Sequence, residues 1–132
     1  MLRRDFIMVQ IEELGKIIAQ LIAQRNNNAA RHIPVQIQTV YDSLKLDKEF
    51  LLTAAPQDIR NFLDQEDSGG TLRMEIAIKG LIEESFYVEP AERKKLLLRA
   101  KELLEYLQAT DHTFSFERIN QLNEIEEWLH EI

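Results

Sequence analysis

Residues 3–25, RRDFIMVQIEELGKIIAQLIAQR, carry the hydrophobic pattern that decides the fold class. Aliphatic side chains recur there every three or four residues, which places them on one stripe of an α-helix. The stripe consists of Ile7, Ile11, Leu14, Ile18 and Leu21, and Phe6, Ile17 and Ile22 widen it. The pattern predicts one long helix that ends at the asparagines 26–28, because asparagine favours turns.

Two arginines followed by an apolar-rich stretch also suggest a secretion signal or a membrane anchor. A signal peptide needs an unbroken apolar region, and a spanning helix needs about 20 mostly apolar residues. Acidic, basic and amide side chains interrupt the stretch between Asp5 and Lys16, and the longest charge-free run after Lys16 covers only residues 17–24. We therefore expect a protein that is not exported by this route and has no membrane partner.

The rest of the chain continues the helical pattern. Only 4 glycines and 3 prolines occur in 132 residues, and helix-forming residues are abundant. Helix starts are indicated by first-turn prolines or capping side chains at Pro34, Asp47, Pro56, Pro90 and Ser115. Short connections favour antiparallel neighbours. The sequence predicts an all-α fold, a compact array of about six antiparallel helices in a single domain over residues 1–132.

The clearest interruption of the helical pattern is residues 64–70, DQEDSGG. Its acidic residues, serine and paired glycines are typical of an exposed connection. We expect such a connection here, or a hinge if the function requires one.

Composition narrows the possible chemistry and partners. The chain has no cysteine, which excludes thiolate metal sites, thiol catalysis and disulfides, and fits a cytoplasmic protein. The net charge is −7, with 8 basic and 14 acidic side chains in residues 67–132. The one basic cluster, in residues 93–101, is interleaved with glutamates, which is typical of a solvated helix surface. We expect no nucleic-acid partner.

Two resemblances to known families accompany these patterns. In residues 71–132, small and large side chains alternate at helical spacing, at Ala91, Leu97, Ala100, Leu104 and Tyr106. This half resembles the helix hairpins of tetratricopeptide-like folds, without their 34-residue repeat.

The opening RRDFIMVQIEEL, together with TFSFERINQL near the other end, resembles a family of small bacterial proteins of unknown function. Their members begin with an Arg-Asp-aromatic-aliphatic-Met-x-Gln-Ile motif. The resemblance implies a bacterial, cytoplasmic, all-helical protein and no particular activity.

Two groups of side chains suggest an enzyme as the alternative. Glu127 and His130 have the Glu-x-x-His spacing of di-iron helical bundles, but no second such pair occurs. Asp111 and His112 lie near hydroxyl side chains in the sequence, and a catalytic triad combines an acid, a histidine and a hydroxyl group. A metal-dependent hydrolase could use either pair, whereas we interpret them as a solvated helix end and as loop or capping groups. We expect no cofactor and no bound metal.

The apolar stripe therefore supports the leading hypothesis, a non-enzymatic helical interaction or scaffold protein. It would bind a protein partner or associate with itself through the first helix. The candidate interaction residues are Phe6, Ile7, Ile11, Leu14, Ile18 and Leu21. The competing interpretation is that the stripe is buried in the core of the chain itself.

Overall fold

The computed structural model describes residues 2–25, 33–64, 68–111, 113 and 115–132. These residues form seven α-helices, one 3-10 helix and no strand, so the all-α prediction is confirmed with one helix more than the expected number. The elements are α1 (Leu2–Arg25), α2 (Ile33–Ser43), α3 (Lys48–Thr53), α4 (Pro56–Asp64), α5 (Gly70–Glu84), η2 (Ser85–Tyr87), α6 (Pro90–Thr110) and α7 (Phe116–His130).

The predicted capping residues explain where several helices begin. The Asp47 carboxylate accepts a hydrogen bond from the Phe50 N–H (3.2 Å), and the Ser115 hydroxyl accepts one from the Arg118 N–H (3.2 Å). Pro90 lies in the first turn of α6, where its missing N–H leaves no helical hydrogen bond unmade. Local sequence therefore sets these boundaries.

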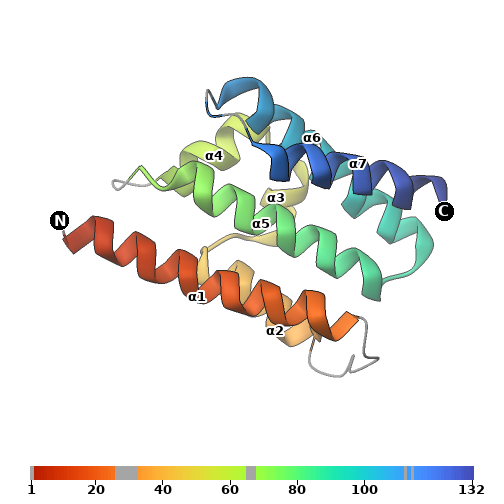
Figure 1. The fold of residues 1–132 in the computed structure, drawn as a ribbon, viewed down its shortest axis with the longest axis horizontal. Helices are drawn as coiled ribbons and strands as arrows, with labels where there is room; N and C mark the ends of the chain where they lie inside the picture. Colours follow the sequence, from red (N-terminus) through yellow and green to blue (C-terminus); the bar gives the residue numbers. More distant parts are fainter. Residues whose placement is uncertain (1, 26–32, 65–67, 112, 114) are drawn as a thin grey trace.

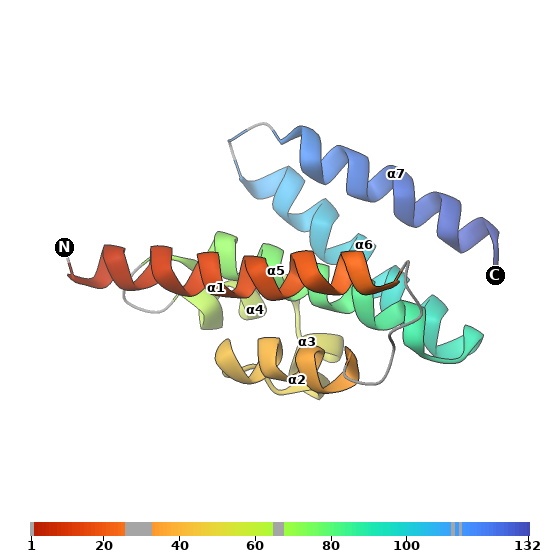
Figure 2. The ribbon, with the colours of Figure 1, turned by 60° about the horizontal axis from the view of Figure 1, so that its bottom comes forward.

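Helix α5 lies at the centre of the fold (Figures 1 and 2). It packs against α1, α2, α4 and α6, and its Met74, Ala77, Ile78 and Leu81 are fully buried. An amphipathic helix normally keeps one face in solvent, so burial of this many residues marks α5 as the core helix. None of the described helices has the length and hydropathy that a membrane span requires.

Buried arginines and a tyrosine connect the helices around α5. Arg73 donates hydrogen bonds to the side-chain oxygen of Gln10 on α1 (2.9 Å) and to the Leu63 carbonyl on α4 (3.0 Å). The Tyr41 hydroxyl on α2 donates to Glu84 on α5 (2.8 Å). Because buried polar groups must be paired, these contacts fix the relative positions of four helices.

The connection between α4 and α5 is closely packed at its described end. Residues 65–67 of the predicted connection lie outside the described residues. The Gly70 N–H donates to the Asp64 carboxylate (3.1 Å), and a Cβ at Gly70 would lie 2.8 Å from the Arg60 carbonyl oxygen. Glycine is required at this position because the α4 backbone approaches so closely.

Helix α7 is packed chiefly on α6. Ile125 is its fully buried aliphatic side chain, while Leu122, Trp128 and Leu129 are partly buried against the core. Arg118 reaches from α7 to Glu75 on α5 (3.1 Å) and to Asp111 in the loop after α6. This packing leaves α7 beside α5 without extensive contact to α1.

Candidate functional site

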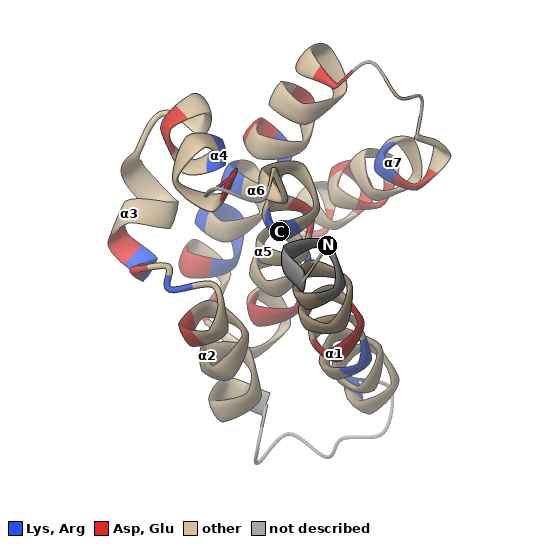
Figure 3. Ribbon diagram, turned by 90° about the vertical axis from the view of Figure 1, so that its left-hand side faces the viewer, with Lys and Arg blue, Asp and Glu red and all other residues tan. Residues whose placement is uncertain are grey.

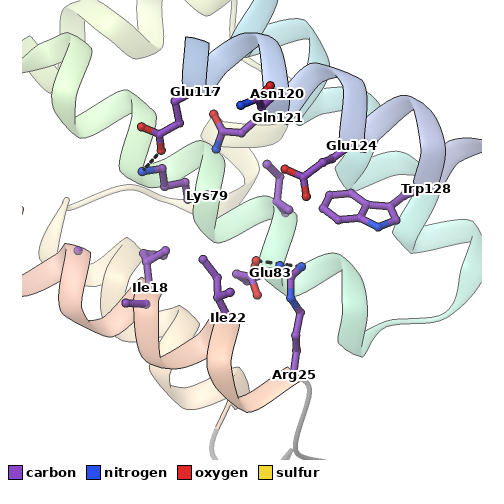
Figure 4. Close-up of a pocket in the computed structure, with 13 residues that line it drawn as sticks. Ile18, Ile22, Arg25, Lys79, Glu83, Glu117, Asn120, Gln121, Glu124 and Trp128 are labelled. Atoms are coloured by element: carbon purple, nitrogen blue, oxygen red, sulfur yellow. Dashed lines mark ion pairs between the residues drawn. The ribbon is translucent and has the colours of Figure 1, made fainter. Parts of the chain in front are cut away.

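An open groove of about 540 Å³ lies between α1 and α7, and Lys79, Ile82 and Glu83 of α5 form its floor (Figure 4). The end-on view in Figure 3 shows α1 and α7 on the same side of α5. The groove exists because α7 follows α6 instead of closing onto α1.

The α1 wall of the groove is apolar and contains small side chains. It consists of Gly15, Ile18, Ala19 and Ile22, followed by Arg25 at the end of the helix. A Cβ built at Gly15 would meet no described atom within 4 Å. Glycine within a helix costs roughly 0.5–1 kcal/mol relative to alanine. No packing contact with the described residues accounts for that cost, and the small residues leave the helix backbone accessible from the groove.

The α7 wall of the groove is polar. Glu117, Asn120, Gln121 and Glu124 line it, and Trp128 stands at its far end. Glu117 pairs with Lys79 on the floor (2.7 Å). Glu124 is exposed and makes no ion pair with any described residue. One wall therefore offers apolar contact and the other offers carboxylates and amides.

Arg25 connects the three sides of the groove at one end. Its guanidinium lies 3.4 Å from the Glu83 carboxylate, 4.6 Å from the centre of the Phe86 ring and 5.6 Å from that of Trp128. The Phe86 and Trp128 rings themselves pack edge to face at 5.0 Å. An arginine over aromatic faces is stabilised by the cation–π interaction, so α1, α5 and α7 meet at this cluster.

Glu83 is the buried ionisable group of the floor. Its side chain is 4% exposed, and its Oε1 atom has no hydrogen-bond partner among the described residues. Burial raises the pKa of this carboxyl to about 7; Arg25 opposes the increase and Glu124 adds to it. A buried oxygen without a partner is costly, and such groups are frequent at functional sites.

The six predicted interaction residues differ in their burial. Ile7, Leu14, Ile18 and Leu21 are buried in the core of the chain, Ile11 is half-buried and Phe6 is 64% exposed. Of the six, only Ile18 lines the groove. Of the residues that widen the stripe, Ile22 also forms part of the groove wall.

The described residues considered for an enzyme lie in two places, after α6 and at the end of α7. Glu127 and His130 are both exposed on the last turns of α7, and Asp111 pairs with Arg118. His112 lies outside the described residues. No group of three or more His, Asp or Glu side chains among the described residues could hold a metal ion.

Comparison of the chain with protein-family models, curated proteins and solved structures finds no match. The resemblance of the opening motif to a family of small bacterial proteins therefore stays a prediction. The groove itself was not predicted, because its three sides come from helices that are far apart in the sequence. The signal present in the sequence was the pair of small residues, Gly15 and Ala19, four positions apart on the first helix.

Proposed function

We propose that this protein is a non-enzymatic interaction module that binds a helical segment of another protein in the groove between α1 and α7. The observation that carries the proposal is the groove itself, which is open and has one apolar and one polar wall. Such a trough suits an amphipathic helix, which presents an apolar and a polar face together.

The tetratricopeptide-like architecture expected for the second half belongs to this proposal. Helices α5, α6 and α7 follow one another as packed neighbours that reverse direction (Figure 1). Arrays of helix hairpins commonly form concave binding surfaces. The cytoplasmic location and bacterial origin are also part of the proposal, and the lack of cysteine supports the location.

Affinity capture with matched baits tests the proposal. Ala19 lines the groove, whereas Ala23, one turn further along α1, is exposed outside the lining. We expect a protein that is retained by the wild type and by Ala23→Asp but lost with Ala19→Asp, with equal helicity of all three baits by circular dichroism. A set of captured proteins that does not depend on Ala19 would contradict the proposal.

Self-association through the first part of α1 is the second candidate, because Phe6, Met8 and Val9 are exposed there. Sedimentation measured across micromolar concentrations separates the two candidates. A mass that rises with concentration and returns to the monomer value in Val9→Lys favours self-association. A monomer at every concentration excludes it.

A further inference from the structure

We propose that the groove binds a cationic amphipathic helix, and that a lysine or arginine of this partner lies between Glu83 and Glu124. The inference rests on the proposed helix-binding function and adds the chemistry of the partner. It depends on the length of the groove, on its charges and on the unpaired oxygen of Glu83.

The length of the groove fits a short helical segment. Its lining extends from Glu117 to Trp128 on α7 and from Gly15 to Arg25 on α1. At a rise of 1.5 Å per residue these stretches are about 15–17 Å long, which corresponds to roughly three turns of a bound helix. The small side chains of Gly15 and Ala19 allow the bound backbone to approach α1 closely.

The charges of the groove favour a cationic partner. Three carboxylates and two cationic side chains line it. Both cations are already engaged, Lys79 with Glu117 and Arg25 with Glu83. Glu124 has no cationic partner among the described residues, so the α7 wall carries one carboxylate that no cation of the groove neutralises. An excess of carboxylates on one wall attracts a cation and repels an anion.

Glu83 gives the groove a point at which a cation can be recognised. Its carboxylate is buried on the floor; among the described residues Oε2 forms an ion pair with Arg25 and Oε1 has no hydrogen-bond partner. A small adjustment that brings an ammonium or guanidinium group to Oε1 would satisfy this atom. Hydrogen bonds between oppositely charged groups are about twice as strong as neutral ones. The partner's cation would then lie between Glu83 on α5 and Glu124 on α7, beside Arg25 from α1.

Intrinsic fluorescence provides a direct measurement, because Trp128 is the only tryptophan and lies at the end of the groove. We would titrate the full chain with three tryptophan-free 18-residue helical peptides. All three share one leucine face, and their polar positions are all lysine, all glutamine or all glutamate. We expect the lysine peptide to shift the Trp128 emission and to bind at least about tenfold more tightly than the other two.

Three substitutions locate the binding. Glu124→Gln should weaken the lysine peptide by about tenfold, whereas Glu127→Gln, an exposed glutamate of α7 outside the lining, should change its affinity less than about twofold. Ala19→Asp should also reduce binding, because it places a hydrated group in the apolar wall. Equal effects of Glu124→Gln and Glu127→Gln, or no effect of Ala19→Asp, would show binding elsewhere and overturn the proposal.

The pH dependence tests the role of Glu83 separately. The charged and titratable groups around Glu83 are Arg25 from α1, Glu124 from α7 and Tyr87 from η2. Because the pKa of Glu83 is raised to about 7, the carboxylate gains charge as the pH rises through this value. The lysine peptide should therefore bind more tightly at pH 8 than at pH 6, and this difference should disappear in Glu83→Gln. A difference that persists in the variant contradicts the role of Glu83.

The peptide results and the capture experiment can fail independently. If the glutamine peptide binds as tightly as the lysine peptide and Ala19→Asp weakens both, the groove binds helices but the inferred charge preference is wrong. If no peptide binds, the inferred partner is wrong, and capture with the Ala19→Asp bait still decides the proposed function. A second copy as occupant would appear as a dimer that the lysine peptide dissociates, which also overturns the inference.

Discussion

Gly15 and Gly70 demonstrate how differently the fold uses two glycines. Gly15 lies within α1 with open space beside it, while Gly70 lies against the α4 backbone. Gly15→Ala should raise the free energy of unfolding by roughly 0.5–1 kcal/mol, because alanine is the better helix former. Gly70→Ala should lower it by about 1–3 kcal/mol, because the new Cβ meets backbone atoms that cannot rotate away. Urea unfolding measures both; changes of the same sign would contradict this account.

Glu83 makes the stability of the chain depend on pH. Its pKa is raised from 4.5 to about 7 in the folded state, so the folded protein holds this proton more tightly than the unfolded chain. The corresponding stabilisation is complete below about pH 4.5 and is lost as the pH rises through about 7. The free energy of unfolding of Glu83→Gln, taken relative to that of the wild type, should therefore increase by about 1–3 kcal/mol from pH 5 to pH 8.

The exposed Glu127 provides the control for this pH dependence. Urea unfolding of Glu127→Gln should follow the wild type at both pH values. If the free energies of unfolding of Glu83→Gln and the wild type differ by the same amount at pH 5 and pH 8, Glu83 ionises normally in the folded protein.

At the scale of the element, Arg118 determines the position of α7. Its guanidinium is buried and pairs with Glu75 on α5 and Asp111 after α6. Arg118→Met removes the charge but retains much of the side-chain volume. We expect a loss of about 2–4 kcal/mol in the free energy of unfolding, because two partly buried carboxylates lose this cation. Hydrogen exchange should become faster in α7 than in α5.

Lys101→Met is the matched control for Arg118→Met. Lys101 also connects α7 to the rest of the fold, through Glu126, but this pair lies at the surface. We expect little change in hydrogen exchange of α7 for this variant, because exposed ion pairs contribute little. Equal protection of α7 in the two variants would mean that Arg118 does not hold the helix.

The helices were predictable because their signals are local. The stripe in residues 3–25, Asp47 and Ser115 each determine structure within a few residues. Periodicity could not determine what covers the stripe, because core and partner bury the same side chains. The groove depends on contacts such as Arg118–Glu75, which join residues 43 positions apart. The adjacent Glu83 and Glu84 show the same limit: the first faces Arg25 and the second faces Tyr41 and Lys48.

At the scale of the whole molecule, one hydrophobic cluster includes residues from all seven described helices, from Leu14 on α1 to Ile125 on α7. A continuous core of this kind favours a single cooperative unfolding transition. We therefore expect the wild type to show the same urea midpoint by far-ultraviolet circular dichroism, which reports on every helix, and by Trp128 fluorescence, which reports on α7. Two separate transitions would mean that the parts before and after residues 64–70 unfold independently.

The Arg118→Met variant makes the same comparison sharper. Since α7 adds only Ile125 to the fully buried aliphatic side chains, its attachment depends strongly on the ion pairs of Arg118. In this variant the fluorescence midpoint should fall below the circular dichroism midpoint, because α7 separates before the helices around α5 unfold. Coincident midpoints at lower urea would instead show that α7 and the α5 core unfold together. That result would make the α7 wall of the groove part of the same cooperative unit as the core.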